Sequence, residues 1–150
     1  MSSKVFHFLP DIDPLGGAQN LVVDLCCASP HDFSIVVLSS SKNSHLLNVL
    51  QRSNVKILRF SFFSFLNIFY QAIRRRCILH FHLSRPFYFS LLFPFCQKVY
   101  TEHHTQNKRR DIILLSLFDR IFVYPTFRKV ICISSGCKKV FRTILANHRI

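Results

Sequence analysis

The chain has 150 residues, of which 49% are hydrophobic and 17 are phenylalanine, and this composition excludes a disordered protein. Its formal net charge of +13 favours anionic partners such as phosphorylated ligands, acidic lipid headgroups or nucleic acid. The longest strongly apolar stretches, 60–73 and 86–96, are shorter than the ~20 residues of a membrane helix, so we expect no membrane span. Six cysteines lie in apolar runs, without a zinc-type CxxC spacing or a signal peptide, which favours free thiols in a reducing cytosol.

The first segment, 4–25, predicts a strand, a glycine-containing loop and a helix. Apolar residues 5–9 form the strand, Pro10 ends it, and Gly16 and Gly17 then precede a run with apolar residues at helical spacing. Glycines at such a junction let backbone N–H groups approach a ligand closely, and a helix N-terminus favours negative charge. An ordinary tight turn is the alternative interpretation, because this is not a full GxGxxG pattern.

The rest of the chain alternates between strand-like and helix-like segments. Short apolar runs predict strands at 33–39, 55–60, 77–82, 98–102 and 129–134, and longer segments predict helices at 43–53, 62–76, 86–97, 111–124 and 136–146. Strands that alternate with helices, several of them apolar throughout, predict an α/β fold with a Rossmann-like, doubly wound parallel sheet. No internal repeat or low-complexity linker divides the chain, so we expect a single domain over residues 1–150.

Polar residues gather at the predicted carboxyl ends of the strands, where doubly wound sheets bind their ligands. His80 and His82 share one face of a strand, because strand side chains alternate with a period of two, and His103 follows the next strand. A zinc site built from these three histidines is conceivable, but no fourth ligand has a persuasive spacing, so we expect no bound metal. For His80 and His82 the alternative is a structural role, with polar strand ends bonded to loop backbone.

Five motifs occur in order along residues 4–145: KVFHFLPDIDPLGGAQNLVVDL, VKILRF, CILHFH, KVYTEHHT and KVICISSGCKKVF. Together they resemble the N-terminal domain of the GT-B glycosyltransferases of family 4, the retaining, nucleotide-sugar-dependent "glycosyltransferase group 1" enzymes. That family has GGAE where this chain has Gly16-Gly17-Ala18-Gln19, DIVHxH where it has 77–82 without the leading Asp, TxH where it has Thr101-Glu102-His103, and vIavS where it has 130–134.

The resemblance implies one half of a GT-B fold and hexosyl transfer from a nucleotide-sugar to a saccharide or lipid-linked acceptor, as in polysaccharide biosynthesis. It implies that Gly16 and Gly17 approach the donor phosphates, that His103 is the catalytic-site residue between donor and acceptor, and that His82 lines the acceptor side of the cleft. The nucleotide-sugar is a substrate, and no cofactor is expected. The family's donor domain carries an E-x7-E motif, whereas Glu102 is this chain's only glutamate. We therefore expect a chain truncated before the donor domain, which is inactive unless a separate donor domain completes it.

Basic residues cluster at Arg74-Arg75-Arg76 and at Lys108-Arg109-Arg110. With nearby phenylalanines they favour a cytoplasmic protein bound peripherally to an anionic membrane surface at its inner face, and a solvated face is the alternative. A non-enzymatic basic module for nucleic acid or anionic membrane is the rival class of function that the charge permits. We expect no nucleic-acid partner, because the aromatic residues lie in continuous apolar runs rather than between Arg and Lys.

Overall fold

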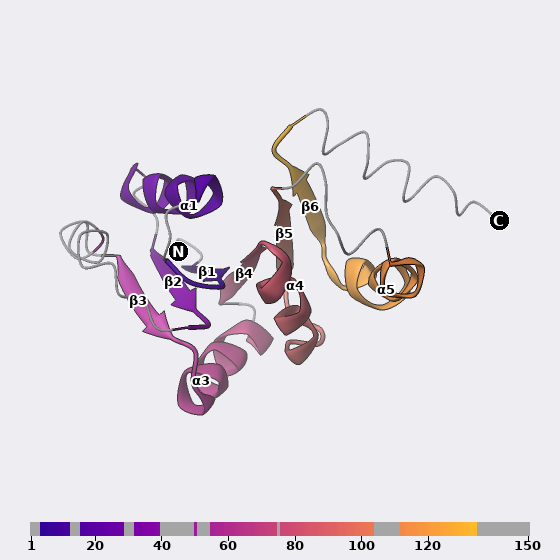
Figure 1. Ribbon diagram of the computed structural model, residues 1–150. Coiled ribbons are helices and arrows are strands. Elements are labelled where there is room, and N and C mark those ends of the chain that lie inside the picture. The colour runs from indigo at the N-terminus through magenta and orange to yellow at the C-terminus, as the bar shows by residue number, and fades with distance from the viewer. Residues whose placement is uncertain are drawn as a thin grey trace.

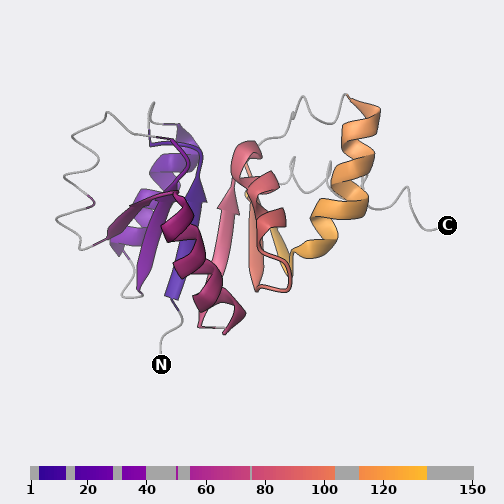
Figure 2. The same ribbon diagram turned by 90° about the horizontal axis from the view of Figure 1, so that it is seen from below.

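A computed structural model describes residues 4–12, 16–28, 32–39, 50, 55–74, 76–103 and 112–134. Six strands form one sheet in the order β3-β2-β1-β4-β5-β6, and all neighbouring pairs are parallel (Figures 1 and 2). The strands are β1 (Lys4–Leu9), β2 (Phe33–Val37), β3 (Lys56–Arg59), β4 (Cys77–His82), β5 (Lys98–Glu102) and β6 (Lys129–Cys132). The α-helices within the described residues are α1 (Gly17–Ala28), α3 (Phe62–Ile73), α4 (Ser84–Phe89) and α5 (Ile113–Phe118). The predicted α/β, Rossmann-like sheet is confirmed.

The helices cover both faces of the sheet, with α1 on one side and α3 and α4 on the other (Figure 1). Beneath α1, aliphatic side chains such as Val22 pack on Leu9 and Ile35. The opposite core is aromatic, and its fully buried rings include Phe8, Phe81, Phe87 and Phe93. The chain passes from one face to the other between β1 and β4, which makes this strand pair the topological switch point of the sheet.

Local sequence explains where several helices begin and end. A reciprocal capping box starts α3, because Ser61 donates its N–H to Ser64 Oγ at 2.7 Å and accepts the Ser64 N–H at 3.3 Å. The helix predicted at 86–97 is wrong at both ends: α4 begins earlier, and a 3-10 turn, η1 (Ser90–Leu92), ends the helical run. Pro94 explains this end, because the residue before a proline disfavours helical backbone and proline donates no N–H.

Of the helices predicted at 43–53, 111–124 and 136–146, only the second lies mostly within the described residues. The segment predicted as a helix at 111–124 is α-helical only in α5, followed by a π turn, η3 (Asp119–Val123), and a 3-10 turn, η4 (Tyr124–Thr126). The helix predicted at 43–53 lies, apart from residue 50, outside the described residues, and the one at 136–146 lies wholly outside them.

The five described cysteines are free thiols, and no helix within the described ranges is long and apolar enough to cross a membrane.

Candidate functional site

A cleft of about 700 Å³ opens at the carboxyl edge of the sheet. Its walls come from the residues that directly follow β4, β5 and β6, together with Gly16 and the first turns of α1: Gly16, Gly17, Ala18, Gln19, Leu21, Leu83, His103 and Ile133. Loops after parallel strands converge at this edge, which is why residues far apart in the sequence meet here. The cleft brings Gly16 and Gly17 together with His103.

The two glycines have different surroundings. Neither has a positive φ, so the backbone conformation does not itself demand glycine. A Cβ atom at Gly17 would meet no atom within 4 Å, whereas one at Gly16 would lie 2.7 Å from Oε1 of Gln19. Gln19 is buried and donates from Nε2 to Oδ1 of Asp11 at 3.4 Å. The space in front of Gly17 therefore leaves the first turn of α1 open to a ligand in the cleft.

Leu83 contributes strained backbone to the cleft wall. Its φ of 65° and ψ of 178° place it in a region that glycine adopts and other residues almost never do. Such strain costs about 1–3 kcal/mol and persists only where the surrounding structure enforces it. The residue joins buried His82 at the end of β4 to the first turn of α4, so the chain has little freedom on either side.

A row of three hydrogen-bonded imidazoles runs from the core to the cleft. Nε2 of His103 lies 3.1 Å from Nδ1 of His82, and Nε2 of His82 lies 3.0 Å from Nδ1 of His7. His82 and His7 are only 2% and 1% exposed. His82 therefore differs from its expected place on the acceptor side of the cleft: it lies behind the wall and holds the ring of His103.

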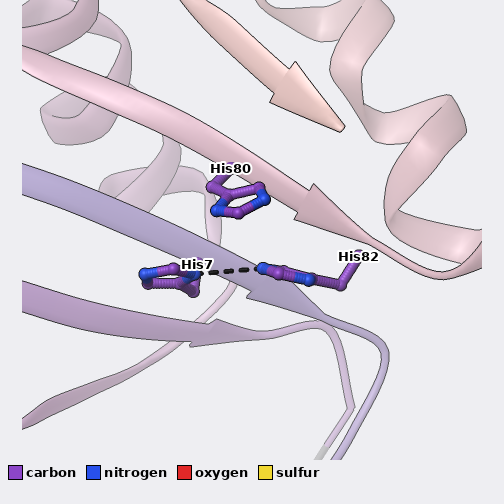
Figure 3. Close-up of side chains that lie close together, drawn as sticks. All are labelled: His7, His80 and His82. Atoms are coloured by element: carbon purple, nitrogen blue, oxygen red, sulfur yellow. Dashed lines mark hydrogen bonds between the residues drawn. The ribbon is translucent and has the colours of Figure 1, made fainter. Parts of the chain in front are cut away.

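His80 lies beside this row, on the same face of β4 as His82 (Figure 3). Its Nε2 is 2.7 Å from Oγ1 of Thr101 on β5. His80 and His82 thus bond to side chains of β1, of β5 and of the residue that follows β5, rather than to loop backbone.

His7 belongs to the same cluster but was not predicted from the sequence. β1 and β4 pair in a register that sets His7 opposite His80 and Phe8 opposite Phe81. Residues opposite each other in a parallel pair project to the same face, so His7 joins the two histidines of β4. The signal was the His-Phe dipeptide in both strands, but it has meaning only once the strands are known to be neighbours in this register.

Burial keeps the clustered histidines uncharged. It lowers the pKa of His7 to about 4 and that of His80 to about 3, and it holds the pKa of His82 well below the usual 6.5. Neighbouring imidazoles lower the pKa of His80 and His82 further, because a second positive charge close by is unfavourable. A neutral imidazole has one donor and one acceptor nitrogen, so His82 accepts a hydrogen bond from one of its two neighbours in the row and donates one to the other. At its inner end, Nε2 of His7 has no hydrogen-bond partner.

Comparisons with protein-family models, with curated proteins and with solved structures find no match to this chain. A helix N-terminus with open backbone and an imidazole held by a buried partner share one cleft. Together these groups suit a ligand that carries both a negative charge and hydroxyl groups.

The described basic residues do not line this cleft. Arg74 is exposed at the end of α3, with its guanidinium carbon 4.3 Å from the centre of the Tyr70 ring, and Arg76 is exposed nearby. The other members of the predicted basic clusters, Arg75, Lys108, Arg109 and Arg110, lie outside the described residues. The outer face of α3 beside Arg74 is apolar and exposed at Phe62, Phe63, Leu66, Tyr70 and Ile73.

Proposed function

We propose that the cleft binds a nucleotide-sugar and that the chain acts as the N-terminal, acceptor-side half of a GT-B hexosyltransferase acting on a saccharide or lipid-linked acceptor. The observation that carries this proposal is the meeting of Gly17 and His103 in one cleft of about 700 Å³ at the carboxyl edge of the sheet. That volume is in the range of small-ligand sites.

Each wall of the cleft has a definite task in this proposal. The first N–H groups of a helix have no partner within the helix, and the helix dipole favours negative charge there, so the open turn at Gly17 binds the diphosphate. His103, whose ring is held by His82, orients a sugar or acceptor hydroxyl. Binding at this wall uses backbone donors and one imidazole, and it needs no charged side chain from the cleft.

Transfer itself requires a second wall. Transition-state stabilisation depends on groups fixed around the reacting atoms on all sides, and the described residues that line the cleft offer one imidazole and no charged side chain. We therefore expect this chain to bind a nucleotide-sugar without turning it over at a useful rate, and to support transfer once a donor-binding domain of a related transferase is supplied in trans.

Titration calorimetry with a panel of UDP-, GDP- and ADP-sugars tests the binding step. A Cβ at Gly17 meets no atom within 4 Å, so Gly17→Leu is expected to fold normally while its side chain fills the cleft and abolishes binding. Gly17→Ala is the matched control and should retain most of the affinity, whereas His103→Ala should weaken binding. Absence of saturable binding by every nucleotide-sugar, or unchanged affinity in Gly17→Leu, contradicts the proposal.

We further propose that the protein is cytoplasmic and associates with the inner face of a membrane through the outer face of α3. Phe62 and Phe63 are 69% and 82% exposed on this helix, and Arg74 and Arg76 lie next to it. Exposed aromatic side chains beside cationic ones are typical of interfacial helices that bind anionic lipid.

Vesicle flotation distinguishes this placement from a solvated basic face. We expect the protein to float with vesicles containing anionic lipid and not with neutral ones, and added salt should reduce the effect. Phe63→Ser should lower the bound fraction, while Leu114→Ser, which changes an equally exposed apolar residue on α5, should not. Equal binding to neutral and anionic vesicles, or equal loss in both variants, argues against it.

A further inference from the structure

We propose that His7, His80 and His82 form a binding site for a divalent transition-metal ion, with Zn²⁺ as the best match, between β1 and β4. The three rings meet on one face of this strand pair (Figure 3). One ring nitrogen from each residue lies within 4.8 Å of those of the other two. Their ring centroids are 4.1–5.3 Å apart. Nitrogens this close need only small side-chain movements to share one ion at the ~2.0–2.1 Å of a Zn–N bond.

For His80 and His82, the nitrogens that face away from the centre strengthen the assignment. Metal-binding histidines usually have their second nitrogen held by a hydrogen-bond partner, which fixes the orientation of the ring. Nε2 of His80 has Thr101 Oγ1 at 2.7 Å, and Nδ1 of His82 has His103 Nε2 at 3.1 Å. These bonds leave Nδ1 of His80 and Nε2 of His82 as the ligand atoms. The third ligand atom is Nδ1 of His7, which lies 3.0 Å from Nε2 of His82.

The ligand chemistry selects the class of ion. Three imidazoles without a carboxylate suit borderline ions such as Zn²⁺, Co²⁺, Ni²⁺ and Cu²⁺ and disfavour Mg²⁺ and Ca²⁺, which prefer oxygen. All three rings are uncharged at neutral pH, the form in which imidazole binds metals. With three protein ligands, a tetrahedral ion keeps its fourth position for water or another small ligand.

For the set of His80, His82 and His103, the sequence argued against zinc because no fourth ligand has a suitable spacing. The structure changes the membership of the set: His7 replaces His103, which instead holds His82 from behind. Because the site lies between strands and not in the cleft wall, the evidence for it does not rest on the proposed nucleotide-sugar binding.

Metal titration of the full chain, freed of metal with a chelator, tests the proposal. Co²⁺ is the first probe, because tetrahedral Co²⁺ absorbs visible light, and Zn²⁺ should displace it and abolish the band. His7→Gln and His80→Gln should each abolish the band. Cys27→Ser is the control for adventitious thiol binding at an exposed cysteine and should leave the titration unchanged.

Thr101→Val keeps all three ligands and removes only the hydroxyl that holds His80, so it separates loss of the site from loss of the fold. Its metal affinity should fall by about 10- to 100-fold, the usual effect of removing such a partner. A wild-type chain that shows no band, a band that survives in His7→Gln, or an affinity that Thr101→Val leaves unchanged would each overturn the assignment.

Discussion

Acid should unfold this protein at an unusually high pH, because its central strand pair buries uncharged histidines. The pKa of His7 is about 4 in the folded protein, against 6.5 for a free side chain, and that of His80 is about 3. Between the folded and unfolded values, the unfolded chain binds protons that the folded chain does not. Stability is therefore present above pH 6.5 and is lost as the pH falls from 6.5 towards 4.

The size of this loss follows from the two pKa values. At pH 5 an unfolded histidine with a pKa of 6.5 gains about 2 kcal/mol from protonation, while the folded form of His7 gains almost nothing. His7 and His80 together should then lower the free energy of unfolding by about 4 kcal/mol between pH 7 and pH 5. His82 acts in the same direction, because its pKa is also lowered. Domains have only about 5–15 kcal/mol in total, so unfolding near pH 5 is expected.

Urea unfolding at pH 7 and pH 5, with a chelator present to exclude metal binding, measures this loss. His7→Gln removes one of the buried groups, so the difference between the two pH values should shrink by about 2 kcal/mol, whatever the substitution does to stability at pH 7. The reasoning fails if the wild-type protein loses less than about 1 kcal/mol over this range. It also fails if His7→Gln and His80→Gln lose as much as the wild type.

Three other expectations can be checked by urea unfolding. Lys98 is 2% exposed, its Nζ donates to the Ser90 carbonyl at 3.0 Å, and burial lowers its pKa to about 8 from 10.5. Stability should therefore rise by about 1 kcal/mol from pH 7 to pH 9 relative to Lys98→Met, and parallel pH profiles would disprove this. Phe93→Ala should cost about 3–5 kcal/mol, because Phe93 is fully buried and its ring contacts Phe8; a cost below 1 kcal/mol would contradict the packing. Leu83→Gly should be more stable than Leu83→Ala by about 1 kcal/mol, because φ at this position is 65°, and the reverse order would show that the backbone is unstrained.

The sequence predicted the individual helices and strands well, and the contacts between them poorly. Apolar runs such as 77–82 identified buried strands, and the glycines after the first strand placed a helix N-terminus, because both signals are local. The meeting of Gly17 with His103 followed from a general property of parallel sheets. The role of His7 could not be predicted, because it depends on which strands are neighbours and on a register that only the packed structure defines. The left-handed backbone of Leu83 is likewise imposed by its surroundings, since no local signal favours it in a leucine.

Hydrogen bonds connect the buried histidines of the strand pair β1–β4 to His103 in the cleft. A metal ion on Nε2 of His82 would require the proton of that ring to be on Nδ1, which then donates to Nε2 of His103. His103 would in turn carry its own proton on Nδ1 and present a donor there. Occupancy of the buried cluster would thus select the tautomer of the cleft histidine without any movement of the backbone. A ligand that accepts a hydrogen bond from His103 would bind more tightly to the metal-loaded protein, and by reciprocity would tighten metal binding by the same factor.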